Sequence, residues 1–302
     1  MNSYVRSLAT VTQAACAALE AVGKAPRRGK EPDPEGPLTT PVSPDPGATR
    51  DDANSLTLYC LAHAGGSAIP YTRWNRFLPA GVRVEPLELP GHGARLREPL
   101  LEQVEPIVAD LLRTVGPRRG APFALFGHSF GAVLAFELTR RLVRLGTPPA
   151  ALLVAGRNGP TQPLAHRPIH NLDDEAFVAA LIRFGGMPQA LLEQPELLRI
   201  YLPVLRVDLR LAETHPRPPG PPFDVPVTAF GGRRDVLADP EGLLTWERET
   251  TGEFELALLP GGHFFLDEPA FHSLLLSRLA RLTPRATGND PLSRGTTPAA
   301  RR

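Results

Sequence analysis

A serine flanked by glycines is the clearest chemical feature of the sequence. Gly127, Ser129 and Gly131 form the pattern G-x-S-x-G between the apolar run 122–126 and a helical pattern that begins at 130. On a sharp strand-to-helix turn the serine hydroxyl projects above the sheet edge, and the glycines avoid clashes across the turn. The helix also directs the positive end of its dipole at a developing oxyanion. The spacing therefore predicts that Ser129 is a nucleophile for acyl transfer; the alternative is an ordinary serine N-cap.

A serine hydroxyl is a weak nucleophile, so it needs a base and an acid that orients this base. Asp235 follows the apolar run 225–232, and His263 follows the run 254–260. In α/β-hydrolases the order along the chain is serine, acid, histidine. Both residues fall in glycine-containing loops at predicted strand ends, so we expect them at the same sheet edge as Ser129. The competing side chains are His63, His92, His128, His166, His170, His215, His272, Asp208, Asp224 and Asp239.

A second glycine-containing loop, His63-Ala64-Gly65-Gly66, follows the first apolar run of the chain. In lipases and esterases a loop of this type supplies one backbone N–H of the oxyanion hole, and the residue after the nucleophile supplies the other. We therefore expect the N–H groups of Ala64 and Phe130 to form the oxyanion hole. The alternative interpretation is a plain glycine turn.

Apolar runs that alternate with helical patterns predict the elements that position these residues. The runs are short, rich in Val, Leu and Phe, and bounded by Gly or Pro, as expected for buried strands. Their alternation with helices predicts an α/β fold with a mostly parallel central sheet flanked by helices. The expected strands are 56–63, 82–89, 122–128, 150–156, 225–232 and 254–260, and the expected helices are 101–115, 130–145, 240–250 and 267–282.

The segment from about 160 to 222 interrupts this alternation because it has no strand pattern. Its helical patterns lie at 173–184 and 195–213. A helical insertion between two parallel strands is expected over the carboxyl edge of the sheet, where ligands bind, so we interpret it as a lid. The alternative is packing on the far side of the sheet. Three aliphatic residues of this segment either line an acyl channel or pack the lid itself: Leu181, Leu191 and Leu192.

The two ends of the chain differ in composition from its middle. Residues 1–54 form an N-terminal extension, with an amphipathic helical pattern at 4–24 and then a polar, proline-rich stretch that predicts a disordered linker. Residues 285–302 predict a disordered tail. One hydrolase domain is therefore expected over 55–284, with the lid inside it.

Composition and charge exclude several classes of function. The 33 Lys and Arg against 32 Asp and Glu give a net charge of +1, so no general attraction to nucleic acid or to a membrane is expected. No run approaches the ~20 apolar residues that span a bilayer, and the N-terminus lacks a signal-peptide pattern. The two cysteines, Cys16 and Cys60, do not predict a disulfide framework. We expect a cytoplasmic monomer that needs no metal or tightly bound cofactor.

Seven segments of the sequence resemble the type II thioesterases of polyketide and nonribosomal peptide biosynthesis. The resemblance runs from about Leu56 to Leu282, and it implies an α/β-hydrolase fold, a helical lid and a triad at Ser129, Asp235 and His263. The matching segments are LYCLAHAGGSAIPY, LELPGHGAR, FGHSFGAVLAFEL, ALIRFGGMP, LPVLRVDLRLAE, GGRRDV and LPGGHFFL.

The resemblance also implies a substrate and a partner. The substrate is an acyl chain held as a thioester on the phosphopantetheine arm of a carrier protein, and the implied role is to remove stalled or aberrant acyl groups. Phe130 stands where methionine is common in the family, and Val154–Pro160 departs from the usual S-G-R-R-A-P pattern. Three alternatives remain: a general carboxylesterase or lipase, a terminating thioesterase domain cut from a synthase, and a non-catalytic carrier-binding module.

Overall fold

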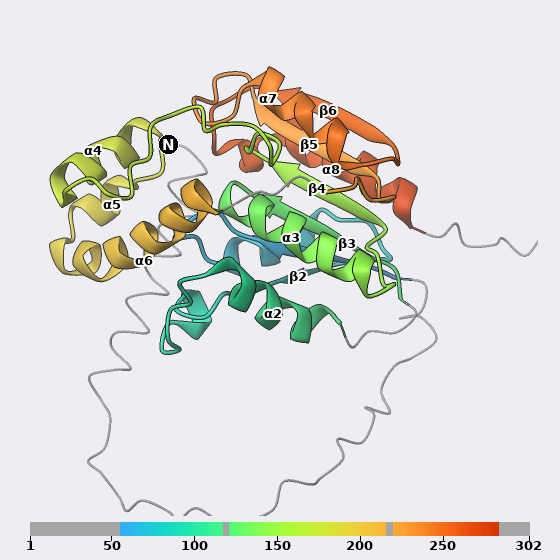
Figure 1. The fold of residues 1–302 in the computed structure, drawn as a ribbon, viewed down its shortest axis with the longest axis horizontal. Helices are drawn as coiled ribbons and strands as arrows, with labels where there is room; N and C mark the ends of the chain where they lie inside the picture. Colours follow the sequence, from blue (N-terminus) through green and yellow to red (C-terminus); the bar gives the residue numbers. More distant parts are fainter. Residues whose placement is uncertain (1–54, 117–120, 216–219, 284–302) are drawn as a thin grey trace, which may run out of the picture.

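A parallel β-sheet lies at the centre of the computed structural model, which describes residues 55–116, 121–215 and 220–283 (Figure 1). The six strands are hydrogen-bonded in the order β2-β1-β3-β4-β5-β6, and every neighbouring pair is parallel. The predicted mostly parallel sheet is therefore confirmed. The strands are β1 Leu56–Leu61, β2 Val82–Pro86, β3 Phe123–His128, β4 Ala151–Ala155, β5 Val227–Gly232 and β6 Phe254–Leu259.

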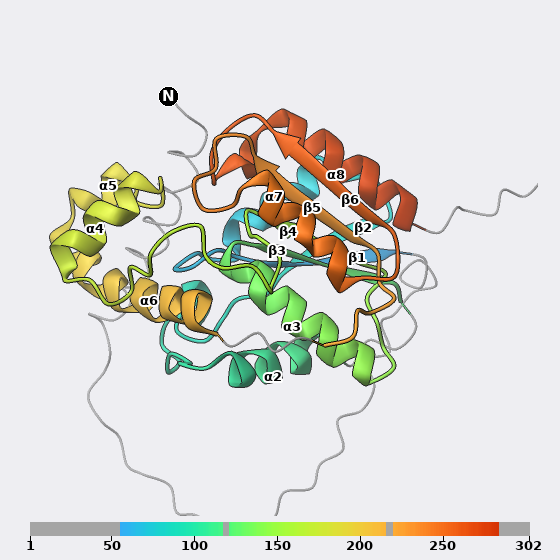
Figure 2. The same cartoon turned by 45° about the horizontal axis from the view of Figure 1, so that its top comes forward.

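Helices cover both faces of the sheet. The helices α2 (Val104–Val115) and α3 (Phe130–Arg144) lie on one face, and η2 (Ile69–Arg76) and α8 (Pro269–Leu282) lie on the other (Figures 1 and 2). Successive side chains of a strand point to opposite faces. Accordingly, alternate residues of β1 enter the two hydrophobic clusters, and all six of its residues are buried. This explains why the strands are continuous apolar runs rather than alternating patterns.

The helices predicted around the sheet are confirmed, with one exception in detail. The stretch 240–250 is divided into α7 (Pro240–Leu244) and the 3₁₀-helix η4 (Thr245–Glu249). Two further short 3₁₀-helices are η3 (Gly93–Arg95) and η5 (Phe265–Asp267). The predicted N-terminal helix, linker and C-terminal tail lie outside the described residues.

Three helices lie together beyond the carboxyl edge of the sheet, between β4 and β5 in the sequence. They are α4 (Asp174–Arg183), α5 (Gln189–Leu192) and α6 (Pro195–Thr214), and both ribbon views place them beside one another (Figures 1 and 2). They share a hydrophobic cluster of their own, in which Leu181 and Leu191 are buried. These two leucines therefore pack the helical insertion. The four-residue α5 was not predicted, because a single turn has no periodicity to detect.

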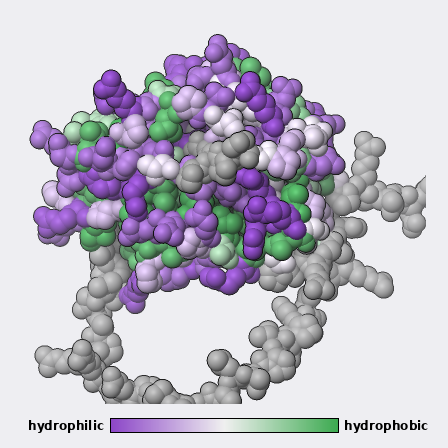
Figure 3. Space-filling model, viewed as in Figure 1, coloured by the Kyte–Doolittle hydropathy of each residue, from purple (hydrophilic) through white to green (hydrophobic). Residues whose placement is uncertain are grey.

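No helix within the described ranges has both the length and the apolar content needed to cross a membrane. On the face shown in Figure 3, hydrophilic residues cover much of the surface, and hydrophobic residues gather in separate smaller areas.

Candidate active site

The backbone at Ser129 has an unusual conformation. With φ 56° and ψ −111°, Ser129 is the only non-glycine residue with positive φ in the described part of the chain. Such a conformation costs about 1–3 kcal/mol and is found mainly at functional sites. Its N–H donates a hydrogen bond to the Ala155 oxygen at the end of β4, with 2.8 Å between the two atoms. The strand-to-helix turn that the sequence predicts is therefore present.

The two glycines of the pattern are required by close backbone contacts. A Cβ atom added to Gly127 would lie 2.2 Å from the Gly131 oxygen, and one added to Gly131 would lie 2.3 Å from the Leu61 oxygen. These distances are far below van der Waals contact, and the atoms in the way belong to the backbone. The first turn of α3 therefore lies directly against the end of β1, and only glycine permits this approach.

His263 and Asp235 meet at the ends of the last two strands. His263 Nδ1 lies 2.9 Å from Asp235 Oδ2, and the two side chains are 3% and 0% exposed. Asp235 Oδ1 also accepts a hydrogen bond from the Leu237 N–H. A carboxylate that accepts from Nδ1–H holds the tautomer in which Nε2 is free to take a proton. The pair therefore has the geometry of a base with its orienting acid.

Ser129 and His263 are both adjacent to the end of β4. The His263 ring packs against Gly156, where an added Cβ would lie 3.0 Å from His263 Cε1. Gly156 directly follows Ala155, the residue that accepts the hydrogen bond from Ser129 N–H. Among the described residues, no hydrogen bond joins the Ser129 hydroxyl to His263. In enzymes without substrate such bonds are often long and shorten only in the complex.

The two predicted oxyanion donors lie on neighbouring segments. Phe130 is the first residue of α3, where a backbone N–H has no acceptor within the helix. Ala64 is buried in the loop that follows β1. An added Cβ on Gly131 would also meet the Ala62 oxygen of this loop, at 2.6 Å. The start of α3 and the Ala64 loop are thus in direct contact, as an oxyanion hole requires.

Two further histidines surround His263 and are held neutral. Burial, with the nearby His263, lowers the pKa of His63 to about 4. Burial also lowers the pKa of His128 well below its ordinary value. His128 Nε2 donates to the His263 backbone oxygen at 3.0 Å, so this ring nitrogen supports the His263 loop. Neutral His63 and His128 rings add no positive charge beside His263.

A second buried histidine–carboxylate pair lies nearby. His92 Nε2 is 2.8 Å from Asp208 Oδ2, and Asp208 accepts a further hydrogen bond from the Gly65 N–H at 2.7 Å. Asp208 is one of the competing candidates for the acid, but these contacts bind it to His92 and Gly65 and not to His263. The sequence analysis did not predict this pair, because the two residues are 116 positions apart and no spacing rule joins them.

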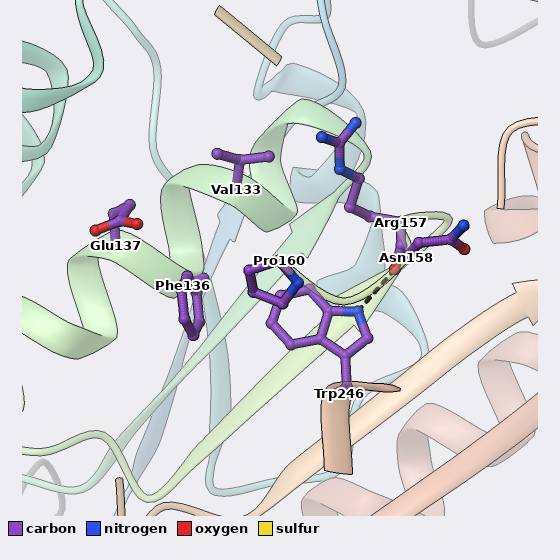
Figure 4. Close-up of a pocket in the computed structure, with 7 residues that line it drawn as sticks. All are labelled: Val133, Phe136, Glu137, Arg157, Asn158, Pro160 and Trp246. Carbon is purple, nitrogen blue, oxygen red and sulfur yellow. Dashed lines mark hydrogen bonds between the residues drawn. The ribbon is translucent and has the colours of Figure 1, made fainter. Parts of the chain in front are cut away.

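The segment after β4 that departs from the family pattern packs against α3 and η4. Trp246 Nε1 donates to the Arg157 oxygen at 2.7 Å (Figure 4). The Arg157 side chain donates to the Ala212 oxygen near the end of α6. Asn158 donates to Asp239, whose other oxygen caps α7. The cavity enclosed here measures about 10 Å³, which is room for one water molecule. This segment therefore joins α6, α7 and η4 by hydrogen bonds.

A parallel sheet with a strained serine after β3 and a buried His–Asp pair after β5 and β6 defines an α/β-hydrolase. Residues 56–280 match the thioesterase domain family, and the chain belongs to that family. It is 39% identical to thioesterase PikA5 of Streptomyces venezuelae, over 71% of this chain and 77% of the relative. It is 35% identical to gramicidin S biosynthesis protein GrsT of Aneurinibacillus migulanus, over 75% and 89%. The solved type II thioesterase BorB of the borrelidin cluster matches with a TM-score of 0.68 at 36% identity, over 76% and 93%.

Gly131→Ala tests the close approach of α3 to β1. The added methyl group would overlap two backbone oxygens, so we expect the free energy of unfolding to fall by about 2–3 kcal/mol. Thioester hydrolysis should fall with it, because the start of α3 must move away from the Ala64 loop. Urea unfolding and initial rates measure both effects. Gly186→Ala is the control, since its Cβ would meet Phe264 at an ordinary 3.5 Å. Equal stability of the two variants would show that α3 does not approach β1 closely at Gly131.

His63→Gln tests the neutral histidine beside the base. An unfolded histidine binds a proton near pH 6.5, whereas folded His63 does so only near 4, so the stability of the wild-type protein falls as the pH drops through this window. Between about pH 7.5 and about pH 4.5 the wild type should lose about 2–3 kcal/mol more unfolding free energy than the variant. Urea titrations at the two pH values measure the difference. Equal losses in the two proteins would show that folding does not lower the pKa of His63.

Proposed function

We propose that this chain is a type II thioesterase that hydrolyses acyl thioesters on the phosphopantetheine arms of carrier proteins. Its role would be to remove stalled or aberrant acyl groups in polyketide or nonribosomal peptide biosynthesis. The observation that carries the proposal is the buried His263–Asp235 hydrogen bond beside the strained Ser129, in a chain of the thioesterase family. The type II assignment is supported by the likeness to PikA5 and BorB.

The proposed mechanism has two acyl-transfer steps. The Ser129 hydroxyl attacks the thioester carbonyl carbon while His263 Nε2 takes its proton. As the tetrahedral intermediate collapses, the carbon–sulfur bond breaks and the imidazolium returns the proton to the leaving thiol. Water then attacks the acyl-serine ester with His263 again as base, which releases the carboxylic acid and restores Ser129. Asp235 stabilises the imidazolium in both steps through its contact with Nδ1.

Charge on the carbonyl oxygen is the main electrostatic demand of each step. In the proposal this oxygen binds the backbone N–H groups of Ala64 and Phe130. Backbone donors fixed before the reaction do not have to reorganise, and the loss of one such donor typically costs ~3 kcal/mol in the transition state. The positive end of α3 adds to this stabilisation, because Phe130 is its first residue.

The helical insertion would act as the lid of the domain. We assign the hydrolase domain to residues 55–284 and the lid to about 160–222, as the sequence predicts. One support is the position of α4, α5 and α6 at the carboxyl edge of the sheet (Figure 2). Another is that these helices have a hydrophobic cluster separate from those of the sheet. A carrier protein would deliver its arm to the site beneath these helices. The expected monomer stays a prediction.

The substrate class is tested with one acyl group presented on a carrier protein, on N-acetylcysteamine and as an oxygen ester. We expect the fastest hydrolysis from the carrier and little from the ester, because the carrier adds binding energy that the small substrates lack. Ser129→Ala should lower kcat by at least about 10⁴-fold. Its control is Ser273→Ala on the exposed side of α8. Ester hydrolysis equal to thioester hydrolysis, without carrier preference, would contradict the proposal and indicate a general esterase.

A further inference from the structure

Both polar groups of the Gly65 backbone are bound by one helix of the lid. The Gly65 N–H donates to Asp208 Oδ2 at 2.7 Å, and the Gly65 oxygen accepts a hydrogen bond from the Tyr201 hydroxyl. Tyr201 and Asp208 are both in α6 and are seven residues apart, so they lie on the same face of the helix. Gly65 directly follows Ala64, the predicted oxyanion donor.

The helix packs on Gly65 as closely as a glycine allows. An added Cβ on Gly65 would lie 2.6 Å from Leu205 Cδ2, and the residue has a φ of +66°. Leu205 lies between Tyr201 and Asp208 on the helix, so three successive turns of α6 contact one residue of the loop. α6 therefore fixes the two peptide groups that flank Gly65. The Ala64 N–H belongs to the preceding peptide group, which is joined to them through the Ala64 Cα, so α6 also restricts where this N–H can lie.

Asp208 is paired with a buried histidine, His92. The Asp208 side chain is 1% exposed, and that of His92 is 3% exposed. His92 Nδ1 faces the Pro90 oxygen at 3.0 Å while Nε2 faces Asp208 Oδ2, so both ring nitrogens meet acceptors, as in an imidazolium ion. Burial alone would lower the pKa of His92, but the charge of Asp208 and its hydrogen bond raise the pKa above the ordinary value. The buried His92–Asp208 pair is therefore hydrogen-bonded to the Gly65 N–H through Asp208 Oδ2.

The far end of the same loop is held independently of the lid. Glu88, which follows β2, accepts hydrogen bonds from the Ser67 hydroxyl and from the Ala68 N–H, each at 3.0 Å. These contacts anchor the loop three residues beyond Gly65 without involving α6. Loss of the α6 contacts should therefore shift the Gly65 peptide locally and leave the loop as a whole in place.

We propose that Tyr201 and Asp208, with His92 as the counterion of Asp208, are positioning residues that hold the Ala64 N–H in the oxyanion hole and so couple the lid helix α6 to the chemical step. The inference rests on the proposed thioesterase function, because it assumes that Ala64 binds the oxyanion. None of the three residues needs to touch the substrate. Their effect should appear in the transition state, where the oxyanion forms, and not in ground-state binding.

The same helix provides a matched control. Glu213 is also 1% exposed on its side chain and is also paired with a histidine, since one of its oxygens lies 2.6 Å from His170 Nδ1. It accepts backbone hydrogen bonds from Ile169 and His170, at the start of the lid. Glu213 thus has the chemistry of Asp208 but binds a segment remote from Gly65. Its replacement tests general damage to the lid.

The experiment compares Asp208→Asn, Tyr201→Phe and Glu213→Gln in the full chain. The first measurement is kcat and KM for an acyl-N-acetylcysteamine thioester. The second is inhibition by an alkylthio trifluoromethyl ketone, whose carbonyl oxygen becomes an oxyanion when Ser129 adds to it. The third is inhibition by the matching thioether, which has no carbonyl group and so needs no oxyanion hole. Cooperative thermal unfolding checks that each variant is folded.

The expected result separates the chemical step from binding. Asp208→Asn should lower kcat by about tenfold and Tyr201→Phe by about threefold, less than the ~100-fold or more for complete loss of an oxyanion donor, with KM within about twofold. Trifluoromethyl ketone inhibition should weaken by similar factors, and thioether inhibition should not change. Glu213→Gln should keep kcat and both inhibition constants within about twofold.

Three results would overturn the inference: folded Asp208→Asn and Tyr201→Phe variants with unchanged kcat, equal weakening of the ketone and the thioether, or the same kcat loss in Glu213→Gln. If Asp208→Asn does not fold, Tyr201→Phe decides, because it removes a single oxygen atom. A wild-type protein without thioester hydrolysis would instead contradict the proposed function, and ketone binding by the variants would still test the positioning role.

Discussion

The close approach of α3 to the end of β1 is the contact on which the rest of the site depends. Gly127 and Gly131 permit this approach because neither position has room for a Cβ atom. The turn between them holds Ser129 in a strained conformation, which the surrounding sheet must stabilise. The same contact brings the start of α3, where Phe130 lies, against the loop that bears Ala64. The positions of the proposed nucleophile and of the proposed oxyanion donors therefore depend on one packing constraint, and the parallel sheet supplies the common edge at which Asp235 and His263 lie.

Buried polar groups around this edge are arranged in two layers. The inner layer is the His263–Asp235 pair, beside neutral His63 and His128. The outer layer is the His92–Asp208 pair, which joins the lid helix α6 to the loop after β1. A buried ion pair is weak evidence for added stability, because desolvation of the two charges offsets most of their attraction. We therefore attribute the position of the His92–Asp208 pair to a role in holding the lid helix and the loop in one arrangement.

Much of this architecture is predictable from local patterns. Both faces of the sheet are covered, so its strands are continuous apolar runs that the sequence reveals directly. The glycines around Ser129, Asp235 and His263 indicate tight turns, which is why the sequence predicts these three residues as the triad. Contacts between distant segments could not be predicted: Tyr201 and Gly65 are 136 positions apart, and nothing local indicates their hydrogen bond. The division of 240–250 into α7 and η4 also depends on packing, since Trp246 turns inward to donate to the Arg157 oxygen.

The most direct test of the account is to trap the covalent intermediate. The wild-type protein is mixed with an acyl thioester, quenched in acid within the first turnovers, and analysed by intact mass and by mapping of its peptides. The account predicts a mass increase equal to the acyl group minus one hydrogen, located on the peptide that contains Ser129 and absent in Ser129→Ala. An acyl group on another residue, or thioester turnover that continues in Ser129→Ala, would contradict the assignment of Ser129 as the nucleophile.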